Sequence, residues 1–429
     1  MSGRLRRSSR RKKEVRRWGE VPEEDRPKRK RKNGAKNAKK PKKSSEVIDL
    51  TLPVQQDVQG EKVGELVIPF AKGFRRPSSE AVKAAIGSFG PGKHDWDQRR
   101  HFVETKSGSE PHFQQIPDCV CIDDWLAQYN EEGQTFKEYI QSVTRRSGQF
   151  KVSANAKKKT ICLLPIGEFG KTAGQGKKFL EFLQQYTEKF FGGTPVRLLE
   201  RIRLEQGKSP EELYWVNGLK TNSRRFRLKI RYDKGSRKRQ IQIDSILCTL
   251  SGIRQSKEFQ RLEPDAFCLV GITLEDLYDT NPDLFVAGMA AGGSKVAVFS
   301  FYRYDPFIRF SSEFWYKTYP TKDYKDSKMS RDDILLARSC KLIVHEICHL
   351  YGIDHCKFYA CCMNGSGHLE EDFRQPYYLC PVDLRKLGRR IDFDIKKRYA
   401  GMVPICKSNP ALREYGEWIS SRLTSLYSD

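Results

Sequence analysis

The chain carries the sequence HEICHLYGIDH at residues 345–355. Upstream of this stretch, Ser330 is followed three positions later by Asp333, the arrangement of an N-terminal capping box, which predicts a helix that begins there. If the helix continues, His345 and His349 lie on the same face, one turn apart, so both imidazoles can reach a single metal ion. The stretch therefore predicts a metal-binding helix.

Gly352 and His355 extend this pattern beyond the helix. Glycine readily takes the left-handed conformation that ends a helix, and the returning chain can bring His355 back as a third nitrogen ligand. Three neutral imidazoles leave a zinc ion with one open position for water. Glu346 is placed to take a proton from that water and pass it to a leaving amine, which predicts peptide-bond hydrolysis. The alternative, a histidine-rich helix without metal, is disfavoured by the added glycine and third histidine.

A group of cysteines follows directly. Cys356 is adjacent to the last histidine, Cys361 comes five positions later, and Cys380 precedes a proline. Together with the zinc motif and Met363, this segment resembles the archaemetzincin family of zinc metallopeptidases, and the resemblance extends over roughly residues 160–406. It implies a metzincin-like zinc metallopeptidase domain with a mixed sheet and an active-site helix.

The resemblance also implies roles for individual residues. His345, His349 and His355 would bind the catalytic zinc ion, and Glu346 would be the catalytic acid and base. Met363 would lie in the turn that packs beneath the three imidazoles. Without the surrounding motif, a single methionine would be interpreted as core filling.

The resemblance implies a second, structural zinc ion bound by four thiolates, and here the sequence departs from the family pattern. Three positions match, namely Cys356, Cys361 and Cys380, but the fourth is Asp383. A carboxylate oxygen can bind zinc, although closed structural sites prefer sulfur or imidazole. We rank Asp383 first as the fourth ligand and Cys362 or Cys406 second. Loss or weakening of the second zinc is the third alternative.

His368 lies just beyond these cysteines, in the glycine-rich stretch of residues 364–368. A role in stabilising an oxyanion or contacting a substrate is one interpretation. A histidine on a surface loop is the interpretation that this context favours, so no role is assigned to it.

An alternation of strands and helices precedes the zinc motif. The hydrophobic pattern predicts strands at 161–164, 195–199, 226–232, 266–273 and 295–304, with helices at 177–191 and 243–253, the first strand ending at Pro165. Such alternation favours an α/β domain on a mainly parallel or mixed sheet, which we place at residues 156–429. Residues 61–155 form an extension with weaker signals, in which we expect short helices at 122–129 and 135–143.

The first sixty residues have a different composition. The 429-residue chain has a formal net charge of +25, and residues 1–43 contain 20 Lys or Arg against 5 Asp or Glu. This composition predicts a disordered basic tail. Its clusters at residues 10–13 and 28–32 are typical of nuclear-import signals, so we expect a nuclear or nucleo-cytoplasmic protein. Neither a secretory signal nor a membrane span is expected.

A small apolar patch follows the tail. Val47, Ile48, Asp49 and Leu50 resemble the motif that binds the ubiquitin-like modifier SUMO. The β-branched pair favours an extended strand that adds to an open sheet edge of a partner. SUMO is therefore a candidate partner.

Two classes of function remain in competition. The first is a zinc metallopeptidase acting on peptides or proteins. The second is a non-catalytic, zinc-stabilised nuclear adaptor that recruits SUMO-modified partners, and the intact Glu346 argues against it. Specific nucleic-acid binding is disfavoured, because most of the positive charge belongs to the tail, which has a single Trp to stack on bases.

Overall fold

The computed structural model describes residues 68–89, 99–102, 112–147, 158–170, 172–216, 225–233, 238–281, 284–308 and 329–427. Its helices are α1 (Ser79–Ile86), α3 (Trp125–Gln128), α4 (Phe136–Ser147), α5 (Ala173–Phe190), α6 (Ile243–Gln255), α7 (Lys257–Leu262), α9 (Arg331–Leu350), α10 (Leu369–Arg374), α11 (Pro381–Ile391), α12 (Ile395–Lys407) and α13 (Arg413–Tyr427). Two short 3-10 helices are η2 (Tyr302–Tyr304) and η3 (Pro410–Leu412). None of these described helices is both long and apolar enough to cross a membrane.

The central sheet has five strands in the order β10-β11-β8-β1-β2. These strands are β1 (Thr160–Ile166), β2 (Val196–Leu198), β8 (Ala266–Thr273), β10 (Gly288–Ala291) and β11 (Val296–Ser300). Strand β1 runs parallel to β2 and β8, β11 runs parallel to β8, and the edge strand β10 is antiparallel to β11. The fold is therefore of the mixed α/β kind, in agreement with the predicted class.

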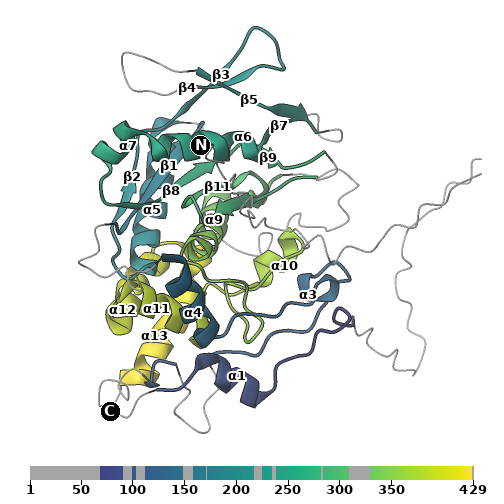
Figure 1. The fold of residues 1–429 in the computed structure, drawn as a ribbon, viewed down its shortest axis with the longest axis vertical. Helices are drawn as coiled ribbons and strands as arrows, with labels where there is room; N and C mark the ends of the chain where they lie inside the picture. The colour runs from purple at the N-terminus through teal and green to yellow at the C-terminus, as the bar shows by residue number, and fades with distance from the viewer. Residues whose placement is uncertain are drawn as a thin grey trace, which may run out of the picture.

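Side chains of β1 alternate between the two faces of this sheet. Ile161 and Leu163 belong to the larger hydrophobic cluster, which includes the buried residues of α5 and α9. Cys162 and Leu164 belong to a second cluster, which includes the buried residues of α6. Helices therefore cover both faces, which explains why every residue of β1 is buried. Figure 1 shows α6 and α9 on opposite sides of the central strands.

The predicted end of the first strand at Pro165 is wrong, because β1 continues to Ile166. The backbone groups of residues 161, 163 and 165 point toward the β2 side, and the last residue of β1 that pairs with β2 itself is Leu163. Beyond β2, an isolated bridge joins Ile166 to Ile202. At Pro165 the hydrogen bond from the neighbouring segment uses the proline carbonyl as acceptor: the backbone N–H of Ile202 donates to it at 2.8 Å. A proline N–H is not needed there, so the strand tolerates the residue.

Two smaller sheets flank the central one. The first contains β3 (Arg203–Gln206), β4 (Leu213–Val216) and β5 (Arg225–Leu228), and the second contains β6 (Ile230–Tyr232), β7 (Arg239–Gln242) and β9 (Asp276–Tyr278). The single strand predicted at 226–232 is thus wrong. The chain changes partner within it, because Leu228 pairs with Leu213 whereas Ile230 pairs with Ile241.

The other predicted elements differ mainly at their ends. The strand predicted at 295–304 ends at Ser300, because the chain then turns into η2, where the Tyr304 N–H donates to the Phe301 carbonyl. The helix predicted at 122–129 is reduced to α3, one turn long.

Residues before β1 lie against the C-terminal helices. Helices α1 and α4 both contact α11, and α12 packs against α13 and α5. A separate small cluster joins Phe74, Ile116, Trp125 and Leu126. In Figure 1 this early part of the chain, from α1 to α4, runs along the side of the molecule that also holds α10 and α11.

Candidate metal centres

Helix α9 carries the first two histidines and begins as predicted. The Ser330 side chain accepts the backbone N–H of Asp333, whose carboxylate accepts the Ser330 N–H in turn, so both halves of the capping box form. The helix ends at Leu350, and Gly352 takes a left-handed φ of 90°. The Gly352 N–H then donates to the His349 carbonyl at 2.9 Å, which turns the chain back toward the helix.

This turn brings His355 to the two helical histidines. The ring centroids lie 4.8 Å apart for His345 and His349, 5.6 Å for His345 and His355, and 5.1 Å for His349 and His355. The Nε2 atoms of His345 and His349 are 3.1 Å apart. One ligand atom of each imidazole lies within 4.8 Å of the other two. The structure therefore assembles the three histidines that the sequence singled out, and we call them the histidine site.

Hydrogen bonds fix which nitrogen of each ring faces the centre. Nδ1 of His345 lies 2.6 Å from the Cys362 carbonyl, and Nδ1 of His349 lies 2.7 Å from the Ile353 carbonyl. A carbonyl only accepts, so both Nδ1 atoms carry the proton and both Nε2 atoms offer a lone pair. Burial, followed by the neighbouring imidazoles, lowers the pKa of His345, which keeps that ring neutral. Neutral imidazoles with converging Nε2 atoms fit a zinc ion.

His355 completes this set from outside the helix. Its Nδ1 lies 3.0 Å from a carboxylate oxygen of Glu131. Its Nε2 is buried and has no hydrogen-bond partner among the described residues. Buried polar atoms in proteins usually have a hydrogen-bond partner or bind a water or an ion, and a metal ion would satisfy this lone pair. Glu131 lies in the extension to which the sequence assigned no chemistry.

Glu346 is buried on α9 and follows His345 directly in the sequence. Its Oε1 atom has no hydrogen-bond partner within the described part of the chain. Burial, with a smaller contribution from the Asp372 carboxylate, raises the pKa of Glu346 to about 8. A carboxylate with a raised pKa is a stronger base than an exposed glutamate, which suits acid–base chemistry near neutral pH.

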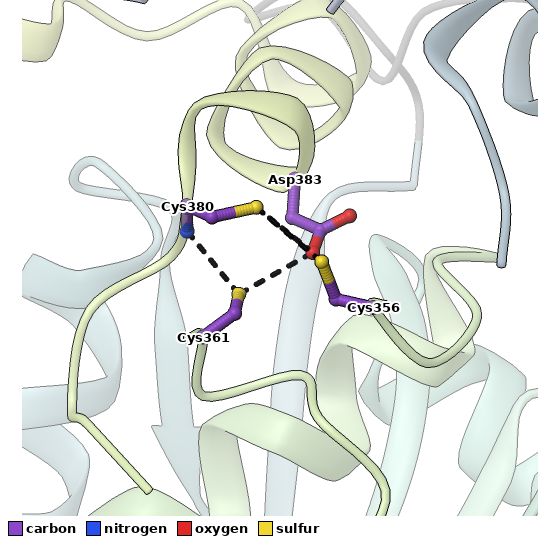
Figure 2. A group of neighbouring side chains, drawn as sticks. All are labelled: Cys356, Cys361, Cys380 and Asp383. Atoms are coloured by element: carbon purple, nitrogen blue, oxygen red, sulfur yellow. Dashed lines mark hydrogen bonds between the residues drawn. The ribbon is translucent and has the colours of Figure 1, made fainter. Parts of the chain in front are cut away.

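The cysteines form a second group, which Figure 2 shows converging from three segments of the chain. Sγ of Cys356 lies 3.6 Å from Sγ of Cys380, and Sγ of Cys361 lies 3.3 Å from Oδ2 of Asp383. All four side chains are buried, and their ligand atoms lie within 4.8 Å of one another. We call this group the cysteine site. It contains Asp383, the residue ranked first at the fourth position.

Lys386 lies beside the cysteine site and was missed from the sequence. Its ammonium group donates to Oδ1 of Asp383 at 2.8 Å, and the two side chains are 1% and 0% exposed. Burial alone would lower the pKa of Lys386, but the Asp383 carboxylate raises it. The i, i+3 spacing on α11 was the available signal, although such pairs are usually solvent-exposed.

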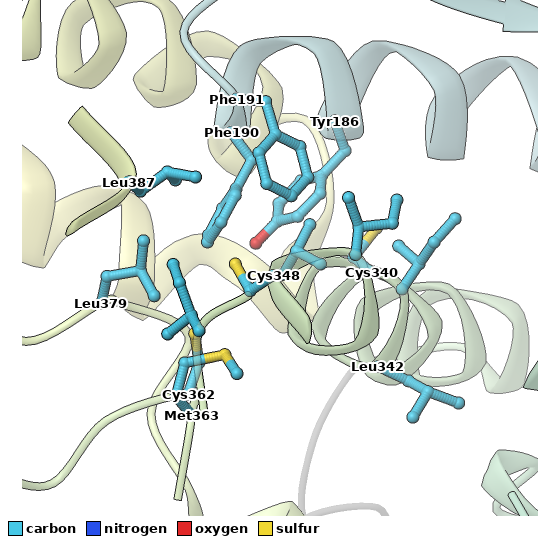
Figure 3. Close-up of a cluster of buried hydrophobic side chains, with 14 of the residues drawn as sticks. Tyr186, Phe190, Phe191, Cys340, Leu342, Cys348, Cys362, Met363, Leu379 and Leu387 are labelled. Atoms are coloured by element: carbon cyan, nitrogen blue, oxygen red, sulfur yellow. The ribbon is translucent and has the colours of Figure 1, made fainter. Parts of the chain in front are cut away.

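The other two candidates for the fourth position, Cys362 and Cys406, do not belong to this group of converging ligand atoms in the described residues. Cys362 and Cys406 belong to the large hydrophobic cluster, and Figure 3 shows Cys362 and Met363 among its apolar side chains. The Cys362 carbonyl lies beside His345 Nδ1, and the Cys362 thiol is not one of the four converging ligand atoms. Met363 is fully buried, and its carbonyl accepts the Cys356 N–H at 2.8 Å. The segment that joins the two sites is thus part of the core.

The prediction that His368 lies on the surface is wrong. Its side chain is 2% exposed, and Nε2 lies 2.8 Å from Oδ1 of Asp124. Nδ1 accepts the Glu371 N–H at 3.3 Å, so His368 caps α10. Although Cys121, Asp124 and His368 form a third group of metal-ligand types, both ring nitrogens already have partners. This group joins the N-terminal extension to α10 through hydrogen bonds.

The predicted partner motif at residues 47–50 and the basic clusters of the tail lie outside the described residues. Their roles in SUMO binding and nuclear import stay predictions.

Known proteins resemble this chain over as much as 65% of its length. A model of peptidase family M54 matches residues 323–389. Archaemetzincin-2 of Macaca fascicularis is 31% identical over 295 residues, which cover 65% of this chain and 71% of that protein. Archaemetzincin-2 of Rattus norvegicus is 32% identical over 288 residues, with the same coverage. Human archaemetzincin-1 is 27% identical over 292 residues, covering 64% of this chain and 50% of that protein.

Solved structures give a weaker likeness. Archaemetzincin from Methanopyrus kandleri is 20% identical, covers 55% of this chain and 96% of its own, and superposes with a TM-score of 0.34. The family assignment therefore rests on the sequence relatives, together with the histidines and cysteines that the fold brings together. With these residues in place, the chain belongs to the archaemetzincin family of zinc metallopeptidases.

Proposed function

We propose that the chain hydrolyses peptide bonds at the histidine site, with one zinc ion bound by His345, His349 and His355. The convergence of three Nε2 atoms carries this proposal, because two of the rings have their Nδ1 atoms bound to carbonyls and the third has its Nε2 buried without a partner among the described residues. When bound, zinc supplies Lewis acidity, which lowers the pKa of a water molecule toward about 7 and polarises a carbonyl oxygen.

In this proposal Glu346 is the general acid and base. Its carboxylate takes the proton of the attacking water and later passes that proton to the nitrogen of the leaving amine. The raised pKa supports this role, because the carboxylate holds a proton readily between the two transfers. Its position on α9, next to His345, keeps it beside the metal ligands.

We further propose that a second zinc ion occupies the cysteine site, bound by Cys356, Cys361, Cys380 and Asp383. Complete burial supports a structural role, since a closed site has no position for a substrate. The carboxylate replaces a thiolate of the family pattern, and it carries the same charge of minus one. A metzincin-like domain with one open and one closed zinc site is the architecture that we infer.

Cleavage of a mixed peptide library by the purified full chain tests the catalytic proposal. Glu346→Gln keeps the shape of the side chain and removes the base, so we expect cleavage to fall by a factor of about 10² to 10⁴ with zinc content unchanged. Glu417→Gln, which changes an exposed glutamate on α13, is the matched control and should cleave like the wild type.

Equal cleavage by the wild type and the zinc-loaded Glu346→Gln variant would remove Glu346 from the mechanism. No cleavage by a wild type with full zinc occupancy would favour the non-catalytic adaptor instead. The library also gives the first profile of preferred cleavage positions, which the shape of the substrate cleft decides.

A further inference from the structure

The residues between α3 and α4 contact the turn that carries His355. Glu131 accepts the hydrogen bond from His355 Nδ1 at 3.0 Å, across a separation of 224 residues in the sequence. Gln134 donates from Nε2 to the Gly352 carbonyl at 3.2 Å and to Asp354 at 2.9 Å. The turn is therefore held from the N-terminal extension as well as from its own helix.

This arrangement sets His355 apart from the other two histidines. His345 and His349 donate to the backbone carbonyls of Cys362 and Ile353, which belong to the same segment as the zinc motif. Only His355, of the three, has a side-chain carboxylate as its Nδ1 acceptor. Its orientation thus depends on a distant part of the chain.

Glu131 is itself held in position. The indole N–H of Trp125 donates to the same carboxylate oxygen at 2.6 Å. Trp125 also packs edge-on against the His355 ring, with centroids 5.3 Å apart at 82°. The indole fits closely over Gly365, where a Cβ atom would lie 2.4 Å from the ring. The backbone N–H of Trp125 donates to Glu371 at 2.8 Å.

A carboxylate in this position has a known physical effect on a metal-bound imidazole. It fixes the tautomer, holds the plane of the ring and increases the basicity of the opposite nitrogen, and loss of such a partner typically costs about 10- to 100-fold in metal affinity or activity. In His355 the opposite nitrogen is Nε2, the buried atom that has no partner among the described residues.

We propose that Glu131 is a positioning residue for the histidine site, and that Trp125 and Gln134 support it so that the N-terminal extension completes the site. This inference rests on the proposed binding of zinc by the three histidines. It assigns a role to residues 125–134 that the zinc motif by itself does not require.

The test measures metal binding in the full chain, separately at each site. Cobalt(II) substitution distinguishes the two sites, because only the cysteine site gives thiolate-to-metal charge-transfer bands. Zinc affinity is measured by competition with a chelator. For Glu131→Ala we expect zinc affinity at the histidine site to fall by about 10- to 100-fold, and affinity at the cysteine site to stay unchanged.

Two further variants make the result specific. Glu131→Gln retains an acceptor oxygen without the charge, so its zinc affinity should fall less than that of Glu131→Ala, by less than about tenfold, but stay measurably below the wild type. Glu132→Ala, which changes the exposed neighbour, should bind zinc at both sites like the wild type.

Unchanged affinity in Glu131→Ala would overturn the inference. If that variant does not fold, Glu131→Gln decides: a wild-type affinity and wild-type cobalt spectrum at the histidine site, or equal losses at both sites, would also overturn it. A wild type that binds no metal at the histidine site would refute the proposed function and this inference together. A wild type that binds metal there, with insensitive Glu131 variants, would refute the inference alone.

Discussion

The histidine site and the cysteine site lie within forty residues of each other in the sequence, but they differ in burial and in the charge of their side chains. All four residues of the cysteine site are buried, whereas two of the three histidines are only half-buried. The cysteine site gathers up to four anionic ligands and has the Lys386 ammonium beside it. The histidine site gathers neutral rings that need only hydrogen-bond acceptors on their far sides.

In the proposed function, this difference separates a structural zinc site from a catalytic one. A closed anionic site holds a metal for stability, since thiolates and carboxylates compensate the charge of the ion from all sides. An open neutral site leaves the charge of the ion available to a substrate. The four predictions below separate these two descriptions, in order of expected size.

Removing a histidine ligand should abolish activity and spare the fold. For His349→Ala we expect peptide cleavage to fall by well over about a hundredfold, because even the outer partners of a metal ligand are worth about 10- to 100-fold. Zinc content should decrease by one ion per chain, as measured by atomic absorption. His112→Ala is the matched control, since His112 lies in the N-terminal extension, where its side chain contacts Ser421 and Trp418. Retained cleavage in His349→Ala would show that the histidine site is not needed for peptide cleavage.

Removing a cysteine ligand should instead cost stability. For Cys361→Ser we expect the free energy of unfolding in urea, with zinc present, to fall by about 4 kcal/mol, because metal binding contributes directly to folding. The fraction that remains folded should still cleave peptides. Cys248→Ser, a change at an exposed thiol, serves as control and should have little effect. Equal stability of the two variants would show that the cysteine site holds no stabilising metal.

Breaking the buried ion pair between Asp383 and Lys386 should lower the free energy of unfolding. Asp383→Asn leaves a buried ammonium without its carboxylate, and we expect a loss of about 3 kcal/mol in unfolding free energy. Replacing both residues, as in Asp383→Asn with Lys386→Met, should recover part of that loss. The double variant would fail to recover stability if the carboxylate acts only as a metal ligand, and urea unfolding of both proteins distinguishes these cases.

The third group, around Asp124, should stabilise the fold through hydrogen bonds and should bind no metal. Burial on its own would raise the pKa of Asp124, but hydrogen bonds from His368 and Val120 and the Arg374 guanidinium lower it to about 2. A carboxyl group with a lowered pKa stabilises the fold above its usual pKa of 3.8, and this contribution is lost as the pH falls through about 2.

Asp124→Asn should therefore destabilise the protein by about 2 kcal/mol at neutral pH, and the difference from the wild type should shrink between about pH 4 and pH 2. Unfolding followed by circular dichroism at several pH values measures it. Zinc content should match the wild type. A lower zinc content in Asp124→Asn would make this group a third metal site.

Local patterns in the sequence identified much of the histidine site. The spacing of His345 and His349 follows from the helical period, the Ser330–Asp333 box starts the helix, and Gly352 ends it with a positive φ. Each of these features depends on residues only a few positions apart. The strand at residues 266–273 was found with its observed bounds, because it is buried on both faces and reads as a continuous apolar run.

Other features depend on contacts between distant residues and left no local signal. Glu131 and Asp124 lie in a stretch with little periodicity, and they meet their histidine partners across 224 and 244 residues. Strand β1 continues through Pro165 because it still pairs there with β8, at a point where β2 has already ended. The switch of sheets within residues 225–232 likewise depends on which neighbours are available.

The sequence by itself therefore determined the candidate ligand types, their order and the helix that presents them, since helical geometry and turn chemistry act over a few residues. Only the tertiary structure decided that Asp383 joins three thiols, that Lys386 is buried beside it, and that a carboxylate from the N-terminal extension faces His355. Those outcomes depend on how buried polar groups find partners when the chain packs, and packing joins residues without regard to their separation along it.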